Sequence, residues 1–242
     1  MARFVLVHGA FSGASVWNPV LPELAARGHE VEAFDLPGSG EDPTPLAEVT
    51  LERYAERVCR QLGRGRPAVL VGHSMGGVAI TQAAAACPAA VASLVYVCAF
   101  LPQNGQSLVE LTHLPESEGD QVQANMVVEG DPPVATLPKL AARSALLECA
   151  EEAQVEWALG TLRPQALLPF TEAVSVGGDE FEALPRAYVT CSRDRAVMPA
   201  LQRRMLEAAR CDPVIALDCD HMPMASRLGD LVDALDRLAE RS

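Results

Sequence analysis

The sequence has 242 residues, of which 49% are hydrophobic and 21% charged, and its formal net charge is −13 at pH 7. This composition holds enough apolar material for one sizeable core, and α/β sheets of this size commonly form a single domain. The acidic excess argues against nucleic acids and anionic membranes as partners. No stretch approaches the ~18 apolar residues that a membrane span requires, and the apolar run at Phe4 to Val7 is too short for a signal peptide. We therefore expect a cytoplasmic protein.

The seven cysteines are an odd number and include no Cys-x-x-Cys pair. Most lie in apolar runs, where a free thiol behaves as a small hydrophobic group, so the sequence predicts reduced, structural cysteines. The five histidines include no His-Glu-x-x-His arrangement, and no other metal-ligand spacing is present. We expect no bound metal.

Short apolar runs alternate with longer helical patterns along most of the chain. The expected strands are Phe4 to Val7, Val31 to Phe34, Ala68 to Gly72, Leu94 to Cys98, Ala187 to Cys191 and Val214 to Leu217. The expected helices are Asn18 to Arg27, Leu51 to Leu62, Met75 to Ala86, Leu201 to Arg210 and Arg227 to Arg241. Thr50 and Ser226 are the expected N-caps of the second and the last helix. This alternation predicts an α/β fold with a doubly wound, mostly parallel sheet and right-handed crossovers.

One segment interrupts the alternation. Residues 103–182 contain no run typical of a buried strand, but they contain an acidic loop at Glu116 to Pro133 and helical patterns at Leu137 to Ala150 and Glu152 to Leu162. About 80 residues are too many for a plain connection between two core strands. We predict that residues 103–182 form a helical cap over the site, while residues 1–102 and 183–242 form the core. A helical decoration without function is the alternative.

The stretch from Ala68 to Gly77 predicts a nucleophile. A buried strand leads into Gly72-His73-Ser74-Met75-Gly76, and a helix of small residues follows. This pattern is typical of the nucleophile elbow of α/β-hydrolases, in which a sharp turn between strand and helix exposes a serine. Ser74 would then lie at a helix N-terminus, where developing negative charge is stabilised.

A serine hydroxyl needs a base to remove its proton, and the base needs a carboxylate to fix its tautomer. His221 is the histidine that follows the last expected strand, as the fold requires. Asp194 follows the strand Ala187 to Cys191, which gives the chain order Ser, Asp, His. Asp218 and Asp220 are nearer in sequence, but a residue so close cannot easily reach back to Nδ1 of His221.

The oxyanion formed during acyl transfer requires two backbone donors. One should be the N–H of Met75, the residue after the nucleophile. The other should come from the loop after the first strand, and we expect the N–H of Ala10, with that of Phe11 as the alternative.

Several segments together resemble the hydroxynitrile lyase and plant methylesterase family. They are Phe4 to Ala10 with Trp17, Gly28 to Val31, Asp35-Leu36, Ser39 to Pro43, Ser192 to Arg195 with Gln202, and Asp220 to Met224. The resemblance covers nearly all the core strands and is looser in the cap. It implies the same triad, an oxyanion hole at Ala10 and Met75, and a small buried pocket under a helical cap. It also implies that no cofactor is needed and, because members of the family are often dimeric, that the protein could form a homodimer.

The family contains two chemistries, and two positions separate them here. Family lyases have a threonine at the position of Gly9 and a lysine at the position of Met222, so both departures favour an esterase. We therefore predict a carboxylic-ester hydrolase that acts on small, largely apolar esters. A hydroxynitrile lyase, a ligand-binding receptor with little turnover, and acyl transfer to an acceptor other than water are the alternatives. The expected substrate-binding residues, several of which could equally be plain packing, are Gly9, Phe11, Leu108, Trp157, Phe170 and Met222.

Overall fold

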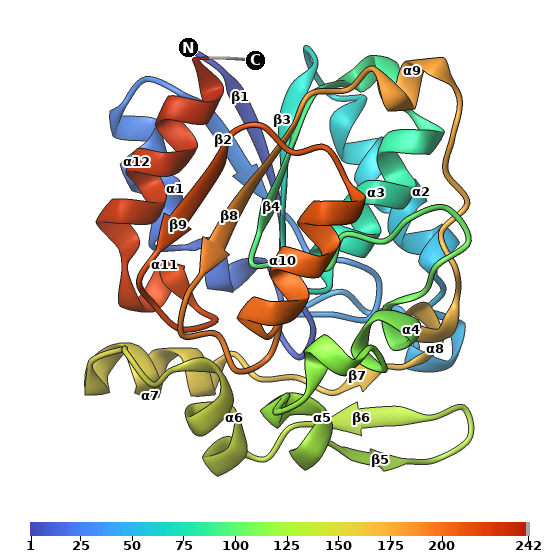
Figure 1. Ribbon diagram of the computed structural model, residues 1–242, viewed down its shortest axis with the longest axis vertical. Coiled ribbons are helices and arrows are strands. Elements are labelled where there is room, and N and C mark those ends of the chain that lie inside the picture. The colour runs from blue at the N-terminus through green and yellow to red at the C-terminus, as the bar shows by residue number, and fades with distance from the viewer. Residues whose placement is uncertain (241–242) are drawn as a thin grey trace.

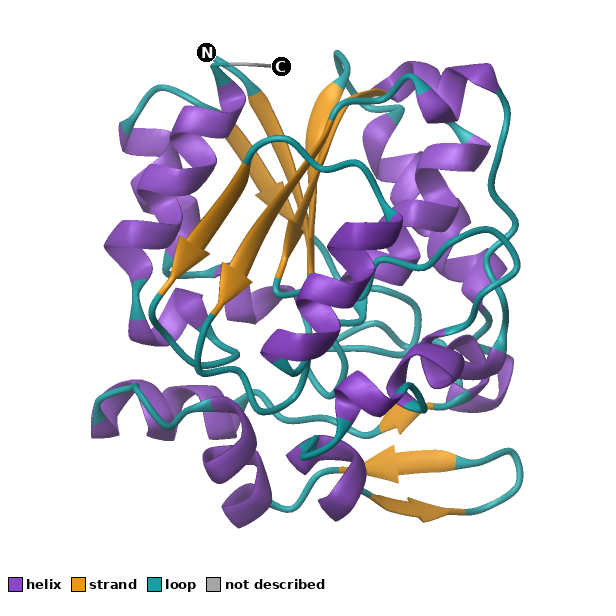
Figure 2. Cartoon of the chain, in the orientation of Figure 1, coloured by secondary structure: helices purple, strands orange, loops and turns teal. Residues whose placement is uncertain are grey.

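Six parallel strands form the centre of the molecule in the computed structural model, which describes residues 1–240 (Figures 1 and 2). The strands are β1 (Arg3–Val7), β2 (Glu30–Ala33), β3 (Ala68–His73), β4 (Val91–Val97), β8 (Arg186–Cys191) and β9 (Val214–Leu217). They pair in the order β2-β1-β3-β4-β8-β9, and every pair is parallel. The interior strands β1 and β3 are buried along their whole length, which explains their continuous apolar runs. The predicted doubly wound α/β fold is confirmed.

Helices cover both faces of this sheet (Figure 1). The helices α1 (Val20–Ala26) and α12 (Leu228–Ala239) bury Leu24 and Leu231 against one face. The other face carries α2 (Leu51–Leu62), α3 (Gly76–Ala86) and α10 (Pro199–Ala208), which contribute to a second apolar cluster. Shorter helices complete the core: η1 (Ala14–Trp17), η2 (Leu46–Glu48), η3 (Pro88–Ala90) and α11 (Pro223–Ser226).

The two predicted N-caps have different outcomes. The side chain of Thr50 accepts a hydrogen bond from the N–H of Arg53 at 3.1 Å, so the predicted cap of α2 is confirmed. The prediction for Ser226 is wrong, because Ser226 ends α11 and its hydroxyl donates to Asp220 Oδ1 at 2.7 Å. The last helix begins at Leu228, and the predicted end at Arg241 lies outside the described residues.

Most of the segment between β4 and β8 lies beyond the carboxyl ends of the core strands, at the bottom of Figure 1, whereas its last helix, α9, lies at the opposite end of the sheet. Its helices are α4 (Leu108–Thr112), η4 (Pro115–Ser117), α5 (Gln121–Asn125), α6 (Lys139–Leu146), α7 (Glu152–Gly160), α8 (Leu168–Thr171) and α9 (Asp179–Glu182). It also contains a small antiparallel sheet of β5 (Val127–Glu129), β6 (Val134–Thr136) and β7 (Gln165–Ala166). The sequence analysis missed this sheet, because strands of two or three residues are too short to show an alternating pattern. We keep the division into core and cap at residues 103–182 as a proposal.

The prediction that every cysteine is reduced is wrong. Cys59 in α2 and Cys87 at the end of α3 form a disulfide, with their Cα atoms 6.0 Å apart. The other five cysteines are free. The two bridged residues are 28 positions apart, so only the packing of α2 against α3 brings them together. No helix within residues 1–240 is long and apolar enough to span a bilayer.

Candidate active site

Ser74 lies in the sharp turn between β3 and α3 and has a φ of 54°, which is unusual for a residue other than glycine. Backbone hydrogen bonds hold this conformation, since the Ser74 N–H donates to Val97 O at 3.3 Å and its carbonyl accepts from Gly77 and Phe100. A Cβ atom on Gly76 would lie 2.7 Å from the carbonyl oxygen of His8. The glycine pattern therefore permits the close approach of backbones that this turn requires.

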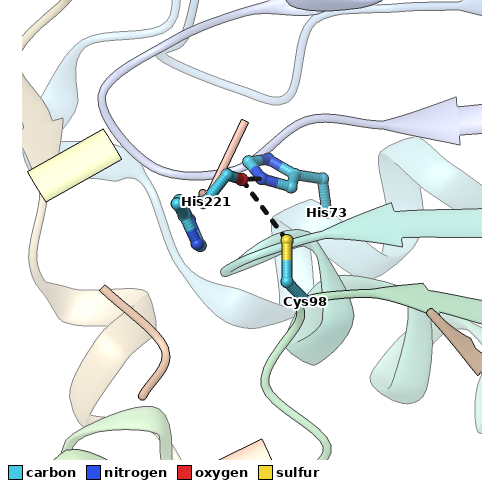
Figure 3. A group of neighbouring side chains, drawn as sticks. All are labelled: His73, Cys98 and His221. Atoms are coloured by element: carbon cyan, nitrogen blue, oxygen red, sulfur yellow. Dashed lines mark hydrogen bonds between the residues drawn. The ribbon is translucent and has the colours of Figure 1, made fainter. Parts of the chain in front are cut away.

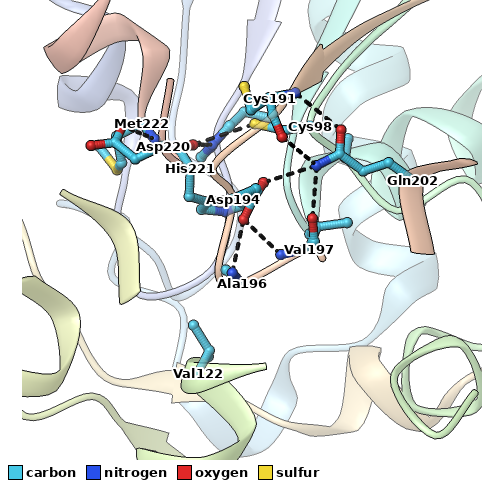
Figure 4. Close-up of polar contacts among 12 residues, drawn as sticks. Cys98, Val122, Cys191, Asp194, Ala196, Val197, Gln202, Asp220, His221 and Met222 are labelled. Carbon is cyan, nitrogen blue, oxygen red and sulfur yellow. Dashed lines mark hydrogen bonds and ion pairs between the residues drawn. The ribbon is translucent and has the colours of Figure 1, made fainter. Parts of the chain in front are cut away.

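His221 and Asp194 form a buried pair next to this turn (Figure 4). They occupy loops after neighbouring strands, β9 and β8, and His221 Nδ1 is 2.8 Å from Asp194 Oδ2. The other carboxylate oxygen of Asp194 accepts from the N–H groups of Ala196 and Val197 at 2.8 and 2.9 Å. Nδ1 is thereby oriented as a donor, which leaves Nε2 as the nitrogen that can accept a proton.

Burial opposes protonation of His221, but the charge of Asp194 and its hydrogen bond outweigh this and raise the pKa of His221 above its ordinary value. Asp220 and Asp120 contribute in the same direction. The environment therefore strengthens the imidazole as a base.

Neither of the two competing carboxylates has a hydrogen bond to the His221 ring in the described chain. Asp218 is exposed and pairs with Arg193, with its Oδ2 atom 2.6 Å from Nη2. Asp220 accepts from the N–H of Cys149 at 2.7 Å and from the Ser226 hydroxyl. Asp220 therefore connects the histidine loop to residue 149, in the segment between β4 and β8.

Two further side chains hold the backbone of the histidine loop (Figure 3). His73 Nε2 is 2.8 Å from the carbonyl oxygen of His221, and the Cys98 thiol donates to the same oxygen at 3.3 Å. Burial and the nearby His221 lower the pKa of His73 to about 3, so His73 is neutral and donates from Nε2. The sequence analysis missed both roles, since no local pattern links residues 73 and 98 to residue 221.

His73, Cys98 and His221 each offer a potential metal-ligand atom, and these atoms lie within 4.8 Å of one another, as a metal site would require. The side chains of His73 and Cys98 already form hydrogen bonds to the His221 carbonyl oxygen. We assign this group to support of the histidine loop.

The two residues whose N–H groups are expected to bind the oxyanion line the same cavity as Ser74. Ala10 and Met75 both line the cavity above Ser74, and within residues 1–240 neither N–H donates a hydrogen bond to a protein acceptor. The N–H of Phe11, the alternative donor, is already used because it donates to Gln165 Oε1 at 3.3 Å. The arrangement thus favours Ala10 over Phe11.

The cavity has a volume of about 180 Å³, and both Ser74 and His221 line it. Of the expected substrate-binding residues, Phe11, Leu108, Phe170 and Met222 line this cavity. Gly9 and Trp157 do not line it. Gly9 packs against the nucleophile, where an added Cβ would lie 2.8 Å from Ser74 Cβ. Trp157 is half-buried and packs against the apolar cluster that contains Leu24 and Leu231. Sequence alone could not separate these roles, because each depends on which way a loop or helix turns.

Asp120 is a cavity residue that the sequence analysis did not identify. Its Oδ1 atom caps α5 by accepting from the N–H groups of Val122 and Gln123. Burial raises the pKa of Asp120 to about 6. The cavity therefore contains a carboxyl group whose charge changes near neutral pH, in a wall that is otherwise mainly apolar.

Known proteins share this fold. The profile described as alpha/beta hydrolase family matches residues 4–234. The sequence is 30% identical to methylesterase 9 of Arabidopsis thaliana, over 100% of this chain and 99% of that protein, and 30% identical to an alpha-hydroxynitrile lyase of the same plant, over 98% and 96%. The crystal structure of a pyrethroid hydrolase from Sphingobium faniae superposes with a TM-score of 0.89 at 25% identity, covering 99% of this chain and 97% of that one. The chain belongs to the alpha/beta hydrolase family.

Proposed function

We propose that the protein is a carboxylic-ester hydrolase with Ser74 as nucleophile, His221 as general base and acid, and Asp194 as the residue that orients His221. The hydrogen bond between His221 Nδ1 and Asp194, on a ring that lines the same cavity as Ser74, carries this proposal. The esterase names of several relatives support it.

The reaction that these positions support has two halves, formation of an acyl-enzyme and its hydrolysis. His221 Nε2 takes the proton of the Ser74 hydroxyl as its oxygen attacks the ester carbonyl carbon, and the N–H groups of Ala10 and Met75 stabilise the oxyanion. His221 then gives the proton to the leaving alcohol, and an acyl-enzyme remains. In the second half His221 takes a proton from water as the water oxygen attacks the acyl carbon. The bond to Ser74 Oγ then breaks, the acid leaves, and His221 returns the proton to Ser74.

The substrate class follows from the size and chemistry of the cavity. A dry cavity on the order of 150 Å³ can hold benzene, so the cavity of about 180 Å³ suits a group somewhat larger than a phenyl ring. Most of its wall is apolar, which favours small, largely apolar esters. The methylesterase relatives favour a methyl alcohol as the leaving group.

A hydroxynitrile lyase is the second candidate, because one relative carries that name. Cleavage of a cyanohydrin releases cyanide, an anion that needs stabilisation by positive charge. The described residues that line the cavity include no lysine or arginine, and Met222 lines it with an uncharged thioether. Arg193 and Arg195 pair instead with Asp218 and Glu148, at 2.6 and 3.1 Å. These contacts favour the esterase.

Covalent labelling of Ser74 tests the proposal. A fluorophosphonate should add one label per chain at Ser74, and Ser74→Ala should lose the label and at least ~10³ in kcat for a p-nitrophenyl ester. Ser12→Ala removes a second hydroxyl that lines the cavity and should still be labelled. Label at another residue would contradict the mechanism, absence of turnover would favour a receptor, and efficient cyanide release from mandelonitrile would favour a lyase.

A further inference from the structure

The loop that carries the proposed donor Ala10 has an unfavourable conformation. Phe11 has a φ of 59°, in the left-handed region that bulky residues rarely adopt. Such a conformation persists only where surrounding contacts hold it. The contacts of Phe11 therefore decide the shape of this loop.

Those contacts come from the segment between β4 and β8. The Phe11 N–H donates to the side-chain oxygen of Gln165 at 3.3 Å, and the Phe11 carbonyl accepts from the N–H of Arg163 at 2.8 Å. The Phe11 ring packs in a cluster with Ala135, Leu137 and Ala142. Both backbone polar groups and the ring of Phe11 are thus held by residues 135–165.

Gln165 is itself fixed. It is 2% exposed, and its amide nitrogen donates to Tyr54 Oη at 3.1 Å and to the carbonyl oxygen of Ala166 at 2.8 Å. Since both partners of the nitrogen are acceptors in this arrangement, the amide oxygen is the atom that faces Phe11. The acceptor for the Phe11 N–H is therefore in place before any substrate binds.

The other side of the loop is held by the core. His8 Nε2 accepts from the N–H of Leu36 at 3.1 Å, so Nδ1 carries the proton and donates to the carbonyl oxygen of Gly9 at 2.7 Å. The Ser12 hydroxyl donates to the same oxygen at 3.2 Å. In a trans peptide the N–H of Ala10 points opposite to the C=O of Gly9. Because the hydrogen bonds from His8 and Ser12 fix the direction of the Gly9 carbonyl, they also fix the Ala10 N–H in the opposite direction.

We propose that Gln165 is a positioning residue for the oxyanion hole: it holds Phe11 in the left-handed conformation and so keeps the Ala10 N–H available to the substrate oxygen. It also occupies the Phe11 N–H, which leaves Ala10 as the donor from this loop. The inference rests on the proposed esterase mechanism. It assigns a catalytic consequence to a residue that lies 154 positions from Phe11 in sequence.

The test compares two variants at one position. Gln165→Met is of similar length but carries a methyl group in place of the amide oxygen, whereas Gln165→Glu keeps an acceptor oxygen. We expect Gln165→Met to lower kcat about 10- to 100-fold, somewhat less than removal of an oxyanion donor outright, with KM changed less than about threefold. Gln165→Glu should recover part of this loss, because a buried, protonated carboxyl group can accept from the Phe11 N–H and donate to the carbonyl oxygen of Ala166. Affinity for an aryl trifluoromethyl ketone, which forms a tetrahedral oxyanion with the serine, should fall in parallel with kcat.

Gln154→Met in α7 is the matched control, because Gln154 is a glutamine outside the cavity whose buried side-chain oxygen has no partner in the described chain. It should leave kcat and ketone affinity unchanged. Should Gln165→Met fail to fold, Gln165→Ala serves the same comparison, since it removes the acceptor and adds no new group. Wild-type kcat and ketone affinity in a folded Gln165 variant without the acceptor would overturn this inference alone. Absence of ester turnover and of Ser74 labelling in the wild type would instead refute the proposed function.

Discussion

The proposed catalytic residues depend on a few short contacts between loops. Asp194 receives hydrogen bonds from His221, Ala196 and Val197, and the Gln202 amide lies 3.3 Å from the oxygen that binds His221. Gln202 is itself held by Cys191, whose N–H donates to its side-chain oxygen at 3.1 Å. This network fixes the carboxylate before substrate binds, and a preorganised carboxylate is what the imidazole requires.

The first prediction at this scale concerns Asp194. Asp194→Asn should lower kcat by orders of magnitude at neutral pH, on the order of 10⁴ in the best-studied serine protease, because the amide favours the wrong histidine tautomer. Asp218→Asn is the control and should keep wild-type kcat, since it breaks an exposed ion pair with Arg193 that adds little stability. Steady-state kinetics with an aryl ester measures both. An equally inactive Asp218→Asn protein would show that the acid has been wrongly assigned.

The second prediction concerns pH. His221 acts as a base only when neutral, so kcat/KM should fall as the pH drops through its raised pKa. Asp120 helps to raise the pKa of His221, so Asp120→Asn should move this acid limb to lower pH. A pH–rate profile with Asp218→Asn as the unshifted reference measures the effect. A shift to higher pH in Asp120→Asn would contradict the electrostatic argument.

At the scale of elements, the sheet and its flanking helices set where the loops meet. The parallel strands β8 and β9 are neighbours, so the loops after them, which contain Asp194 and His221, leave the same edge of the sheet. The helix α3 is tied to α2 by the disulfide between Cys59 and Cys87. Neither cysteine lines the cavity, and Cys87 lies at the end of α3 that is opposite Ser74. The bridge should therefore affect stability and leave catalysis alone.

The prediction for this bridge follows from its sequence separation of 28 residues. Cross-linking a loop of this length stabilises a protein by about 3–4 kcal/mol, chiefly by restricting the unfolded chain. The double variant Cys59→Ser with Cys87→Ser should lose about that much free energy of unfolding and should no longer respond to dithiothreitol. Denaturant unfolding with and without reductant measures this, and kcat should stay unchanged. Equal stability of wild type and double variant under oxidising conditions would contradict the prediction.

At the scale of the whole molecule, the segment between β4 and β8 supplies part of the cavity wall. Leu108 and Phe170 come from this segment, while Phe11 and Met222 come from core loops, and all four line the cavity. The size of the cavity is thus set by two parts of the chain that meet only in the folded protein.

The size of the cavity predicts a limit on acyl length. Among p-nitrophenyl esters, kcat/KM should be at least about tenfold lower for dodecanoate than for butanoate, because the long chain exceeds a cavity of about 180 Å³. Phe170→Ala should reduce this discrimination by enlarging the cavity. Phe181→Ala removes a buried phenylalanine that does not line the cavity, and it should keep the wild-type ratio. Equal rates for both esters in the wild type would refute the size limit.

The sequence by itself determined the features that depend on neighbouring residues. Continuous apolar runs indicated the six core strands, and Thr50 indicated the start of α2, because periodicity and capping act within a few positions. The glycines around Ser74 predicted the tight turn, since only small residues allow the backbones to approach there. The chain order of Ser74, Asp194 and His221 followed from the fold that these patterns predicted.

The tertiary structure alone decided the contacts between residues far apart in the chain. Two such contacts are the disulfide between Cys59 and Cys87 and the hydrogen bond from Phe11 to Gln165, whose partners are too far apart in sequence to leave a periodic signal. The position of Asp120 in the cavity wall likewise depends on how the chain folds. The short strands β5 to β7 form only because they pair with one another. Such contacts depend on how loops and helices pack in space, whereas a local pattern reports only on the preferences of the backbone around it.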